Sequence, residues 1–503
     1  MSESQTNLAW DTLLELGDGR HGPLHARLSS ALREAIRGGR LPPGSALPPS
    51  RALAEDLGCS RWVVTEAYAQ LAAEGYVDAR VGSGTRVRDL GYLGGSGGLE
   101  SEAGAQVAGG HARPSGRPPV NRPDRPPPEA PPAWAPRIDL APGLPDLRAF
   151  PLGRWLSALR SVASTLPYAE LAYPDTTGHP RLRQVLAEYL ARVRGALVDP
   201  ADVTVCRGVS DGTGRVCQAL RAAGIAAVAV EDPGWHRLRE AATGAGLRVV
   251  PTRVDEHGLR VGELDDDPEV RAVIVSPTHQ FPTGVVLSAE RRGALLDWAR
   301  RVGGVILEDD YDAEFRYDRR PVGTMQGTDP SRVVLLGSLS KTLSAALGIG
   351  WVVTPPTLTR PLRATGRQGW PSTLDQLAFA AFLQAGAYDR HLRAARTRYR
   401  RRRDRLVAAL TERLPDARLL GVAAGLHLLV LFDPPVDCAA VVSRAAAGGM
   451  RVANLDTYRC RDDAIGPGLV LGYGNLADGQ LGEAVASLAA IVAESRGGRA
   501  PVR

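Results

Sequence analysis

The sequence has almost no lysine. Of its 61 basic residues, 60 are arginine and one, Lys341, is lysine. A bias of this kind is what a GC-rich coding sequence produces, so a cation that is needed only for its charge is an arginine throughout the chain. Arginine stays protonated at any relevant pH, whereas a lysine amine can lose its proton and condense with an aldehyde. We therefore expect the single lysine where the protein needs an amine nucleophile.

Long apolar runs and paired cysteines are also missing. The longest apolar stretch, near residues 222–230, is only about half of a membrane span. The N-terminus has neither the basic start nor the apolar segment of a secretory signal, and the five cysteines include no C-x-x-C pair. These absences predict a protein of the reducing cytoplasm that does not contact the membrane.

The chain has 503 residues, which are too many for one compact core. Its amino-acid composition changes twice along this length. Residues 90–136 run through GGSGG and then RPSGRPPVNRPDRPPPEAPP. A stretch with so few large apolar residues cannot fold by itself, so we expect a flexible linker there. It separates an N-terminal domain at 12–89 from a C-terminal domain at 137–496, and it predicts that the two domains are tethered and not held rigidly together.

The N-terminal domain is predicted to contain three helices and a hairpin. Apolar residues recur at helical spacing from 24 to 36, and a glycine pair then ends the helix. A second helix, capped by Ser50, and a third, capped by Ser60, are joined by a short turn that contains glycine. Two short strands follow at 76–80 and 85–88. This arrangement indicates an α+β winged helix-turn-helix.

Residues 21–88 closely resemble the winged helix of the GntR family of regulators, on the motifs LPPGSALPPSRALAEDLGCSR and LAAEGYVDARVGSGTRV. The resemblance implies binding to a double-stranded DNA operator, and the net charge of +6 suits such a partner without proving it. An arginine at the start of a recognition helix can contact phosphate or the edge of guanine. The residues that the resemblance places at the DNA are Arg51, Ser60, Arg61, Thr65 and, at the wing tip, Gly82.

The C-terminal region alternates apolar β-branched runs with helical segments. This alternation predicts an α/β domain with a mainly parallel sheet covered by helices on both faces. Ligands of such sheets bind beyond the carboxyl ends of the strands. The predicted strand ends carry GVSDG, EDPGW, SPTHQFPTG, EDDYD and GSLSK. Polar chemistry is therefore expected at one edge of the sheet.

Lys341 directly follows the predicted strand VVLLG, so the single lysine lies in the expected ligand crevice. One strand earlier, EDDYD supplies carboxylates and a tyrosine, which suit the ring nitrogen and ring oxygen of a pyridine cofactor. With these features the region resembles fold-type I pyridoxal-phosphate enzymes of the aspartate aminotransferase kind, and within them the MocR (GabR-like) branch of the GntR regulators. The motifs that carry the resemblance are YPDTTGHPRLRQVLAEYLARVRG, VEDPGW, SPTHQFPTG, LEDDYDAEFRYD and GSLSKTL.

This resemblance implies a fold-type I transferase-like domain that binds pyridoxal 5'-phosphate. Lys341 would bind the cofactor covalently, Asp309 would pair with the pyridine nitrogen, and Tyr311 would hydrogen-bond the ring hydroxyl. Trp235 would stack on the ring, a role that aromatic faces fill well. The phosphate would be held by Ser338 and Ser210, and Tyr173 would reach the site from a partner subunit of a homodimer.

The chain departs from the family pattern at the phosphate site. Relatives usually place an arginine seven residues after the lysine, where this chain has Gly348, and a neutral residue where it has Asp211. Arg237 could receive the carboxylate of an effector or be an ordinary surface arginine. No metal site is expected, because His236, His279 and His427 have no metal-ligand spacing.

The leading hypothesis is a transcription regulator whose aminotransferase-like domain senses pyridoxal phosphate, an amino compound, or both. The segment GLVLGYGNL is apolar where transaminases of this fold carry a substrate-carboxylate arginine, which favours sensing over turnover. Two alternatives stay open. One is an active aminotransferase with a DNA-binding domain, and the other is a regulator whose altered pocket binds a different ligand.

Overall fold

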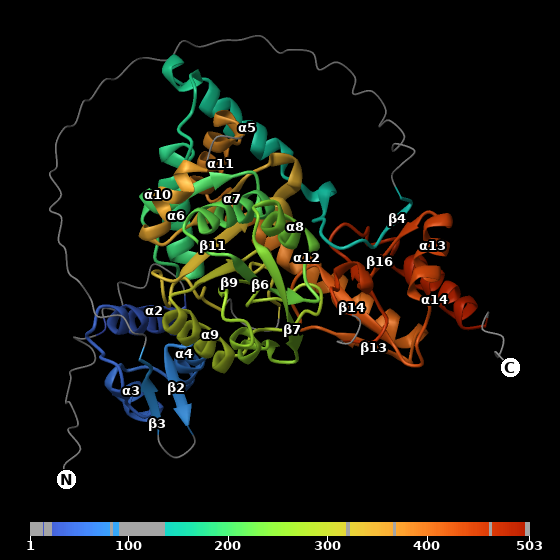
Figure 1. Cartoon of the computed structure of the whole chain (residues 1–503), viewed down its shortest axis with the longest axis horizontal. Coiled ribbons are helices and arrows are strands. Elements are labelled where there is room, and N and C mark those ends of the chain that lie inside the picture. The colour runs from blue at the N-terminus through green and yellow to red at the C-terminus, as the bar shows by residue number, and fades with distance from the viewer. Residues whose placement is uncertain are drawn as a thin grey trace.

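The computed structural model describes residues 14, 23–80, 84–89, 136–317, 322–365, 369–461 and 465–497. Figure 1 shows a small N-terminal body beside a larger one that is made of a central sheet with its helices and a C-terminal lobe. Within these ranges no helix combines the length and the apolar character that a bilayer crossing requires.

The small body is a winged helix, as predicted. Its helices are α2 (Leu24–Arg37), α3 (Ser50–Asp56) and α4 (Arg61–Ala73), and its strands are β1 (Ala46–Leu47), β2 (Val77–Arg80) and β3 (Gly84–Val87), in the order β1-β3-β2. Leu28, Leu32, Leu53 and Leu71 are buried together in its core. The predicted cap of the second helix is wrong, because α3 already includes Ser50 and Pro49 is the capping residue. Ser60 does occupy the cap position of α4, without a side-chain hydrogen bond to the helix.

An eight-stranded sheet forms the centre of the large body, in the order β5-β12-β11-β10-β9-β6-β7-β8. From β11 to β7 neighbouring strands are parallel, whereas β12 and β8 run antiparallel to their neighbours. The predicted mainly parallel sheet is thereby confirmed. Its strands are β5 (Val203–Cys206), β6 (Ala227–Asp232), β7 (Arg248–Asp255), β8 (Gly258–Leu259), β9 (Val270–Val275), β10 (Val305–Asp309), β11 (Val333–Ser338) and β12 (Gly350–Val353).

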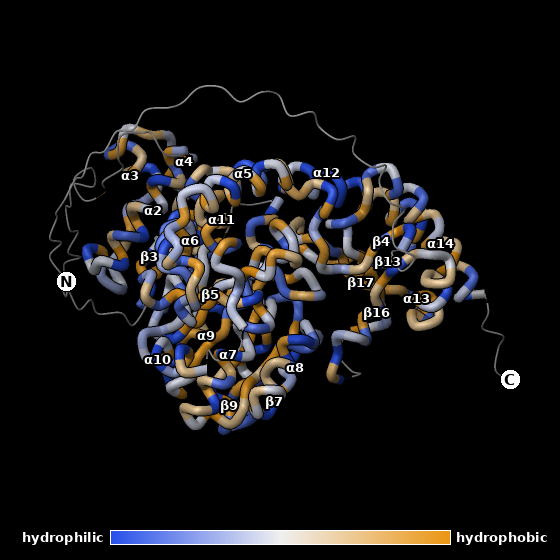
Figure 2. The backbone as a smooth tube through the Cα atoms, turned by 90° about the horizontal axis from the view of Figure 1, so that it is seen from above, coloured by the Kyte–Doolittle hydropathy of each residue, from blue (hydrophilic) through white to orange (hydrophobic). Residues whose placement is uncertain are grey.

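Helices cover both faces of this sheet because neighbouring residues of its buried strands point to opposite sides. Val228 and Val230 pack with α7 (Val209–Ala222), α8 (His236–Gly244) and α10 (Pro356–Ala364). Ala227 and Ala229 pack with α9 (Ala289–Val302) on the other face. The strands form a hydrophobic interior between these layers (Figure 2). Further helices are α5 (Leu152–Ala163), α6 (Pro180–Arg194) and α11 (Thr373–Gln384), which belong to the largest core cluster.

The C-terminal lobe follows the long helix α12 (Ala387–Arg413). Its sheet has the order β13-β14-β17-β16, with α13 (Cys438–Ala447) and α14 (Leu481–Gly497) packed beside it. The strands are β13 (Ala417–Leu420), β14 (His427–Phe432), β16 (Ala453–Asn454) and β17 (Gly468–Gly472), while β15 (Met450–Arg451) pairs with β4 (Ile138–Asp139). Short turns of helix are η1 (Leu147–Ala149), η2 (Tyr168–Leu171), η3 (Pro200–Asp202), η4 (Val261–Asp265), η5 (Ser340–Ser344), η6 (Ala345–Leu347) and η7 (Leu455–Tyr458).

The winged helix touches the large body, which differs from the expected picture of two merely tethered domains. The hydroxyl of Tyr76 donates a hydrogen bond to the carbonyl of Gly327 at 2.7 Å, and Arg37 Nη2 donates to the carbonyl of Gly195 at 2.6 Å. The linker composition could not reveal this contact, because it depends on side chains of the winged helix that meet backbone carbonyls far away in the sequence.

Candidate functional site

A cavity of about 430 Å³ opens at the carboxyl ends of β10 and β11, at the edge of the sheet that the strand pattern predicted. It brings together all residues that were predicted to hold a cofactor except Tyr173. Those lining it are Lys341, Asp309, Tyr311, Trp235, Ser338 and Ser210. Arg237, the candidate effector residue, also lines the cavity, although its side chain is largely exposed.

Lys341 projects into the cavity from the turn that follows β11. Its ammonium donates a hydrogen bond to the carbonyl of Gly143 at 2.7 Å and lies 5.6 Å from the ring centre of Trp235. Burial lowers the pKa of this lysine, and the nearby carboxylates of Asp309 and Asp312 oppose that effect only in part. A buried amine of lowered pKa loses its proton more easily, which is what a nucleophilic lysine requires.

Asp309 closes β10 and is buried, with 6% of its surface exposed. Its Oδ1 atom has no hydrogen-bond partner within the described part of the chain. Burial raises the pKa of this carboxyl to about 8, with a further contribution from Asp312 and Asp310, while Lys341 acts in the opposite direction. A buried carboxyl with a free oxygen beside a cavity is suited to bind a protonated ring nitrogen.

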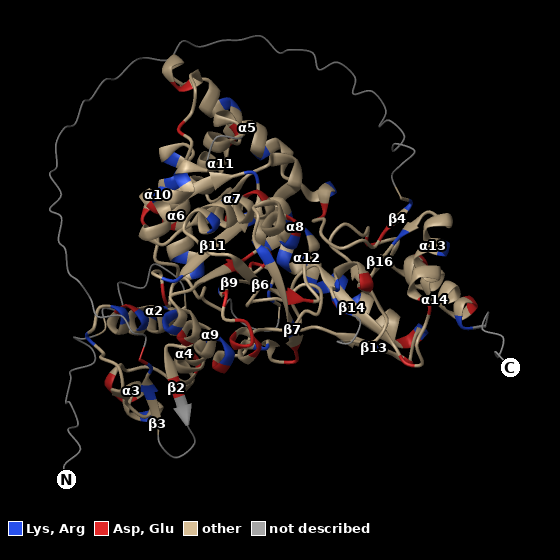
Figure 3. Cartoon of the chain, viewed as in Figure 1, with Lys and Arg blue, Asp and Glu red and all other residues tan. Residues whose placement is uncertain are grey.

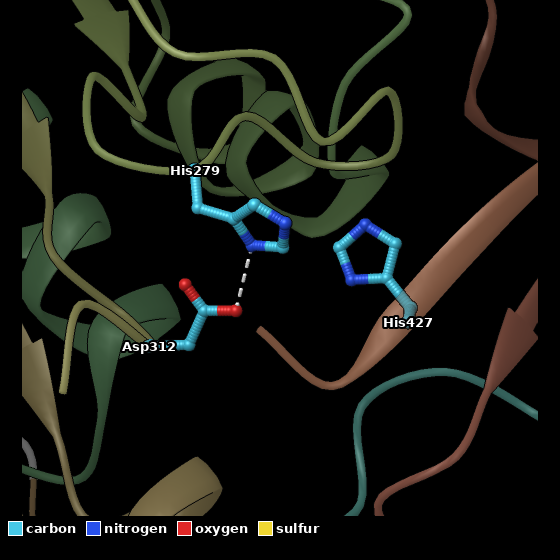
Figure 4. A group of neighbouring side chains, drawn as sticks. All are labelled: His279, Asp312 and His427. Atoms are coloured by element: carbon cyan, nitrogen blue, oxygen red, sulfur yellow. Dashed lines mark hydrogen bonds and ion pairs between the residues drawn. The ribbon is translucent and has the colours of Figure 1, made fainter. Parts of the chain in front are cut away.

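Tyr311 belongs to a hydrogen-bonded group that the sequence reasoning missed. Its hydroxyl lies 3.1 Å from Nδ1 of His279, and the same nitrogen lies 2.9 Å from Oδ2 of Asp312. His427 lies on the far side of His279, with its ring centre 4.9 Å away, and burial lowers its pKa well below the usual value (Figure 4). The available signal was the position of His279 and Asp312 just beyond two neighbouring strands, β9 and β10.

The ligand atoms of His279, Asp312 and His427 lie within 4.8 Å of one another, a grouping that could hold a metal ion. Sequence spacing could not indicate this grouping, because the three residues are far apart along the chain. The hydrogen bond between His279 and Asp312 already satisfies the nitrogen that faces the carboxylate. The same nitrogen lies 3.1 Å from the Tyr311 hydroxyl, so the His279–Asp312 pair also helps to orient Tyr311.

Asp211, one of the two departures from the family pattern, turns its carboxylate away from the cavity. Its Oδ2 accepts the backbone N–H of Arg207 at 2.9 Å, and its Oδ1 accepts Arg215 Nε at 3.2 Å. Arg215 thus neutralises Asp211 inside the first turns of α7. Ser210, one residue earlier, lines the cavity instead.

Gly348 marks the second departure, and the backbone explains why an arginine is difficult there. Its φ is +56°, in the left-handed region that side-chain-bearing residues rarely adopt. On the same side of the cavity Ser338 Oγ lies 2.8 Å from Ser340 Oγ and accepts the N–H of Ser340 at 3.1 Å. Neutral hydroxyls and the amino end of α7 therefore line this side of the cavity, and a helix amino end is a favourable place for an anion.

Trp235 immediately precedes α8, where it forms one wall of the cavity. Its ring stacks on Tyr458, with ring centres 6.0 Å apart and planes at 21°, and meets the ring of Phe281 edge-on at 5.2 Å. These contacts fix the indole beside Lys341. Arg237, two residues further on, is exposed and lines the same cavity.

Tyr173 lies outside the cavity lining and is 96% exposed. Tyr168 and Leu171, in η2 just before it along the chain, are also exposed, at 92% and 63%. Tyr168, Leu171 and Tyr173 therefore form an exposed patch of large side chains in the segment that follows α5. Exposed apolar patches of this kind commonly mark protein–protein contacts.

The predicted DNA-contacting residues share one exposed surface of the winged helix. Arg51, Ser60, Arg61 and Thr65 are all exposed, around the start of the recognition helix α4. Arg61 Nε donates to Ser50 Oγ at 3.3 Å, which links the first turns of α3 and α4. Trp62 is also exposed, at 59%. Gly82, predicted at the wing tip, lies outside the described residues.

Comparison with known families identifies two matched regions. Residues 24–87 match the bacterial regulatory proteins of the gntR family, and residues 138–451 match aminotransferase class I and II. Among solved structures, an archaeal alanine:glyoxylate aminotransferase is similar to 71% of this chain and 91% of its own, with a TM-score of 0.66 and 22% identity. The kynurenine aminotransferase of Pyrococcus horikoshii has a TM-score of 0.65 over 72% of this chain and 92% of its own, at 23% identity. These likenesses establish the fold.

Full-length relatives combine both regions. The HTH-type pyridoxine biosynthesis transcriptional regulator PdxR of Corynebacterium glutamicum is 32% identical over 89% of this chain and 91% of its own length. The probable rhizopine catabolism regulatory protein MocR of Rhizobium meliloti is 33% identical over 93% of each chain. With its winged helix and its aminotransferase-like domain, this chain belongs to the MocR subfamily of GntR transcription regulators.

Proposed function

We propose that this regulator binds pyridoxal 5'-phosphate in the cavity and that the cofactor, or an amino compound that reaches it, sets the state of the protein on DNA. The observation that carries the proposal is the free Oδ1 atom of buried Asp309, which lines the same cavity as the only lysine of the chain. A pyridine nitrogen would supply the partner that Asp309 lacks.

The surrounding side chains fit the remaining parts of the same molecule. The cofactor would supply an aldehyde carbon and a ring that absorbs visible light. The buried amine of Lys341 would attack that carbon, and Tyr311, held by His279, would bond the ring hydroxyl. Trp235 would cover the ring, and the phosphate would contact Ser338 and Ser210.

The absence of an arginine at Gly348 has a consequence for affinity. Loss of a charge-assisted hydrogen bond costs about 1.5–3 kcal/mol, which corresponds to roughly ten- to a hundredfold in affinity. We therefore propose reversible occupancy that follows the concentration of the cofactor, as a sensor requires, with Arg237 available for an effector carboxylate at the mouth of the cavity.

The apolar character of β17 favours sensing over full transaminase turnover. Its residues Gly468–Gly472 are buried, and Val470 packs with Phe281 and Tyr458 beside the cavity. This apolar wall offers no cation for a substrate carboxylate. An active aminotransferase remains the second candidate, favoured by the matched fold and by Lys341, and steady-state transamination with a panel of amino donors distinguishes the two.

The test of the proposal is the visible absorption spectrum of the native protein with equimolar pyridoxal phosphate, followed by borohydride reduction and mass spectrometry. We expect a visible band and a covalent mass increment on the peptide that contains Lys341. A protein that shows neither would contradict cofactor binding, and the cavity would then belong to a sensor of a different ligand.

We also propose the domain organisation on which this function depends. The winged helix comprises residues 12–89, the linker 90–136 and the effector domain 137–496. Residues 90–135 lie outside the described part of the chain, so the linker stays a prediction from composition.

DNA affinity is expected to depend on Arg61. Because this exposed side chain lies at the start of the recognition helix, Arg61→Ala should weaken binding by about 1–3 kcal/mol while the large domain stays folded. Binding can be measured by fluorescence anisotropy on a duplex that the native protein selects from a random pool. Arg393→Ala, on an exposed position of α12, is the matched control. Equal affinities of the two variants would remove the assignment of the recognition helix.

The protein is expected to be a homodimer through its large domain. The exposed patch around Tyr168, Leu171 and Tyr173 is available for a second copy, and a two-fold assembly would also suit a repeated DNA half-site. Sedimentation at micromolar concentration should give the dimer mass, and Leu171→Asp should shift the protein toward the monomer. A native protein that sediments as a monomer with and without DNA would contradict this expectation.

A further inference from the structure

The winged helix docks on two neighbouring backbone carbonyls of the large body. Tyr76 donates to Gly327 O and Arg37 to Gly195 O. The two acceptor residues are in close contact, because a Cβ atom at Gly327 would lie 2.2 Å from Gly195 O and 2.7 Å from Arg37 Nη2. The carbonyls therefore form one docking site that admits only glycine at position 327.

The rest of the contact is polar and open. Arg88 faces Asp297 of α9 at 3.8 Å, and charged residues of both signs lie where α2 and α4 meet the large body (Figure 3). A crevice of about 720 Å³ runs beside the docking site, between α2 and α6. Polar contacts of this kind between domains are usually reversible. Docking therefore depends on whether the two carbonyls are held in the correct positions.

One of the two carbonyls is tied to the end of β10 by a buried ion pair. Arg194, which precedes Gly195 at the end of α6, donates from Nε and Nη2 to the two carboxylate oxygens of Asp310, each at 2.8 Å. The side chains of Arg194 and Asp310 are 1% and 6% exposed. A bidentate pair removed from water fixes both orientation and distance.

The other carbonyl is tied to the same strand end by Glu308. Its two carboxylate oxygens accept the backbone N–H groups of Met325 and Gln326, both at 3.0 Å, in the loop that ends at Gly327. The side chain of Gln326 in turn bonds the backbone of Leu197, at 2.9 and 2.5 Å. The segments that carry Gly195 and Gly327 are thus joined to each other as well as to β10.

Asp309 stands between these two anchoring residues and faces the cavity. We infer that the end of β10 couples the cavity to the winged helix: a ligand that pairs with Asp309 fixes, through Glu308 and Asp310, the two carbonyls on which Tyr76 and Arg37 dock. This inference rests on the proposed binding of pyridoxal phosphate. It adds the route by which an occupied cavity regulates the DNA-binding domain.

Continuity of the backbone is the physical basis of the coupling. Glu308 and Asp309 end β10 and Asp310 follows directly. Three consecutive residues cannot move independently, so a partner that holds Asp309 also restricts Glu308 and Asp310. Docking leaves the DNA-contacting residues uncovered, because Arg51, Ser60, Arg61 and Thr65 are exposed in the docked arrangement. Occupancy of the cavity therefore sets the orientation of the winged helix and does not mask its DNA surface.

Hydrogen–deuterium exchange of the full chain, with and without pyridoxal phosphate, tests the coupling. Bound cofactor, verified in the same sample by its visible band, should slow exchange in the segments around Tyr76 and Gly327 by about fivefold or more, the lower end of ordinary coupling. Tyr76→Phe should bind the cofactor normally but lose this effect in the winged helix. Tyr68→Phe is the matched control, because its hydroxyl bonds the carbonyl of Pro48 within the winged helix.

A second pair of variants examines the anchor in the large domain. Asp310→Asn should reduce the effect of the cofactor on the winged helix, whereas Asp478→Asn, which weakens another pair with a buried arginine, Arg402, should retain it. Equal responses of Tyr76→Phe and Tyr68→Phe would overturn the coupling, as would a native protein that binds the cofactor without any change around Tyr76. A native protein that shows no visible band overturns the proposed function and the coupling together.

Discussion

Lys341→Arg is expected to abolish the visible band and the borohydride-stable adduct completely. Arginine preserves the positive charge beside Asp309, but a guanidinium is a poor nucleophile and forms no stable imine with an aldehyde. Since Lys341 is the only lysine of the chain, no other side chain can replace it. Any response of DNA binding to pyridoxal phosphate should disappear with the band, while basal DNA binding by the winged helix should persist.

The control for this variant moves the lysine to another position. Lys341→Arg combined with Arg393→Lys restores one lysine to the chain at an exposed site on α12, away from the cavity. If position alone gives Lys341 its reactivity, the double variant should show no band with equimolar cofactor. A band of native intensity in either variant would show that the cofactor does not depend on this lysine.

Asp309→Asn is expected to stabilise the cofactor-free protein increasingly as the pH rises. The pKa of Asp309 is raised from its ordinary value of 3.8 to about 8, first by burial and then by Asp312 and Asp310. Between these two values the folded protein retains a proton that the unfolded chain has released. Stability therefore falls with rising pH by about 1.4 kcal/mol per pH unit from this group, and asparagine removes that dependence.

Urea unfolding of the cofactor-free protein at pH 5.5 and pH 7.5 measures this effect. The native protein should lose about 2–3 kcal/mol more than Asp309→Asn over this interval. Asp255→Asn provides a control that should leave the pH dependence of stability unchanged between pH 5.5 and pH 7.5, because the Asp255 carboxyl is ionised there in both the folded and the unfolded chain. Burial raises the pKa of Asp255, but hydrogen bonds from Arg291 and others outweigh burial, so that the net shift is downward. If the free energy of unfolding depended on pH equally in the native protein and in Asp309→Asn, a protonated Asp309 would be contradicted. Asp309→Asn should also weaken cofactor binding.

Local patterns in the sequence were sufficient to predict the helices of the winged helix and the edge of the sheet at which the cavity lies. Helical spacing and glycine stops gave α2, α3 and α4, because an amphipathic helix and its end are coded by neighbouring residues. The strand ends that carry EDDYD and GSLSK meet at one cavity, because parallel strands point their carboxyl ends to the same edge. Because Lys341 is the only lysine of the chain, composition alone identified it as a candidate nucleophile.

Contacts between distant segments were decided only by the tertiary structure. Asp211 stands where relatives have a neutral residue, yet Arg215 and the backbone of Arg207 hold its carboxylate away from the cavity. Composition indicated a free tether, whereas Tyr76 and Arg37 meet carbonyls more than 150 positions away. In the sequence the acidic residues at the end of β10 form one motif. In the structure Glu308 accepts from the backbone of a distant loop, Asp309 faces the cavity, and Asp310 pairs with an arginine of α6. A sequence records which groups are present, while their partners depend on how the chain packs, since burial and pairing are properties of the whole fold.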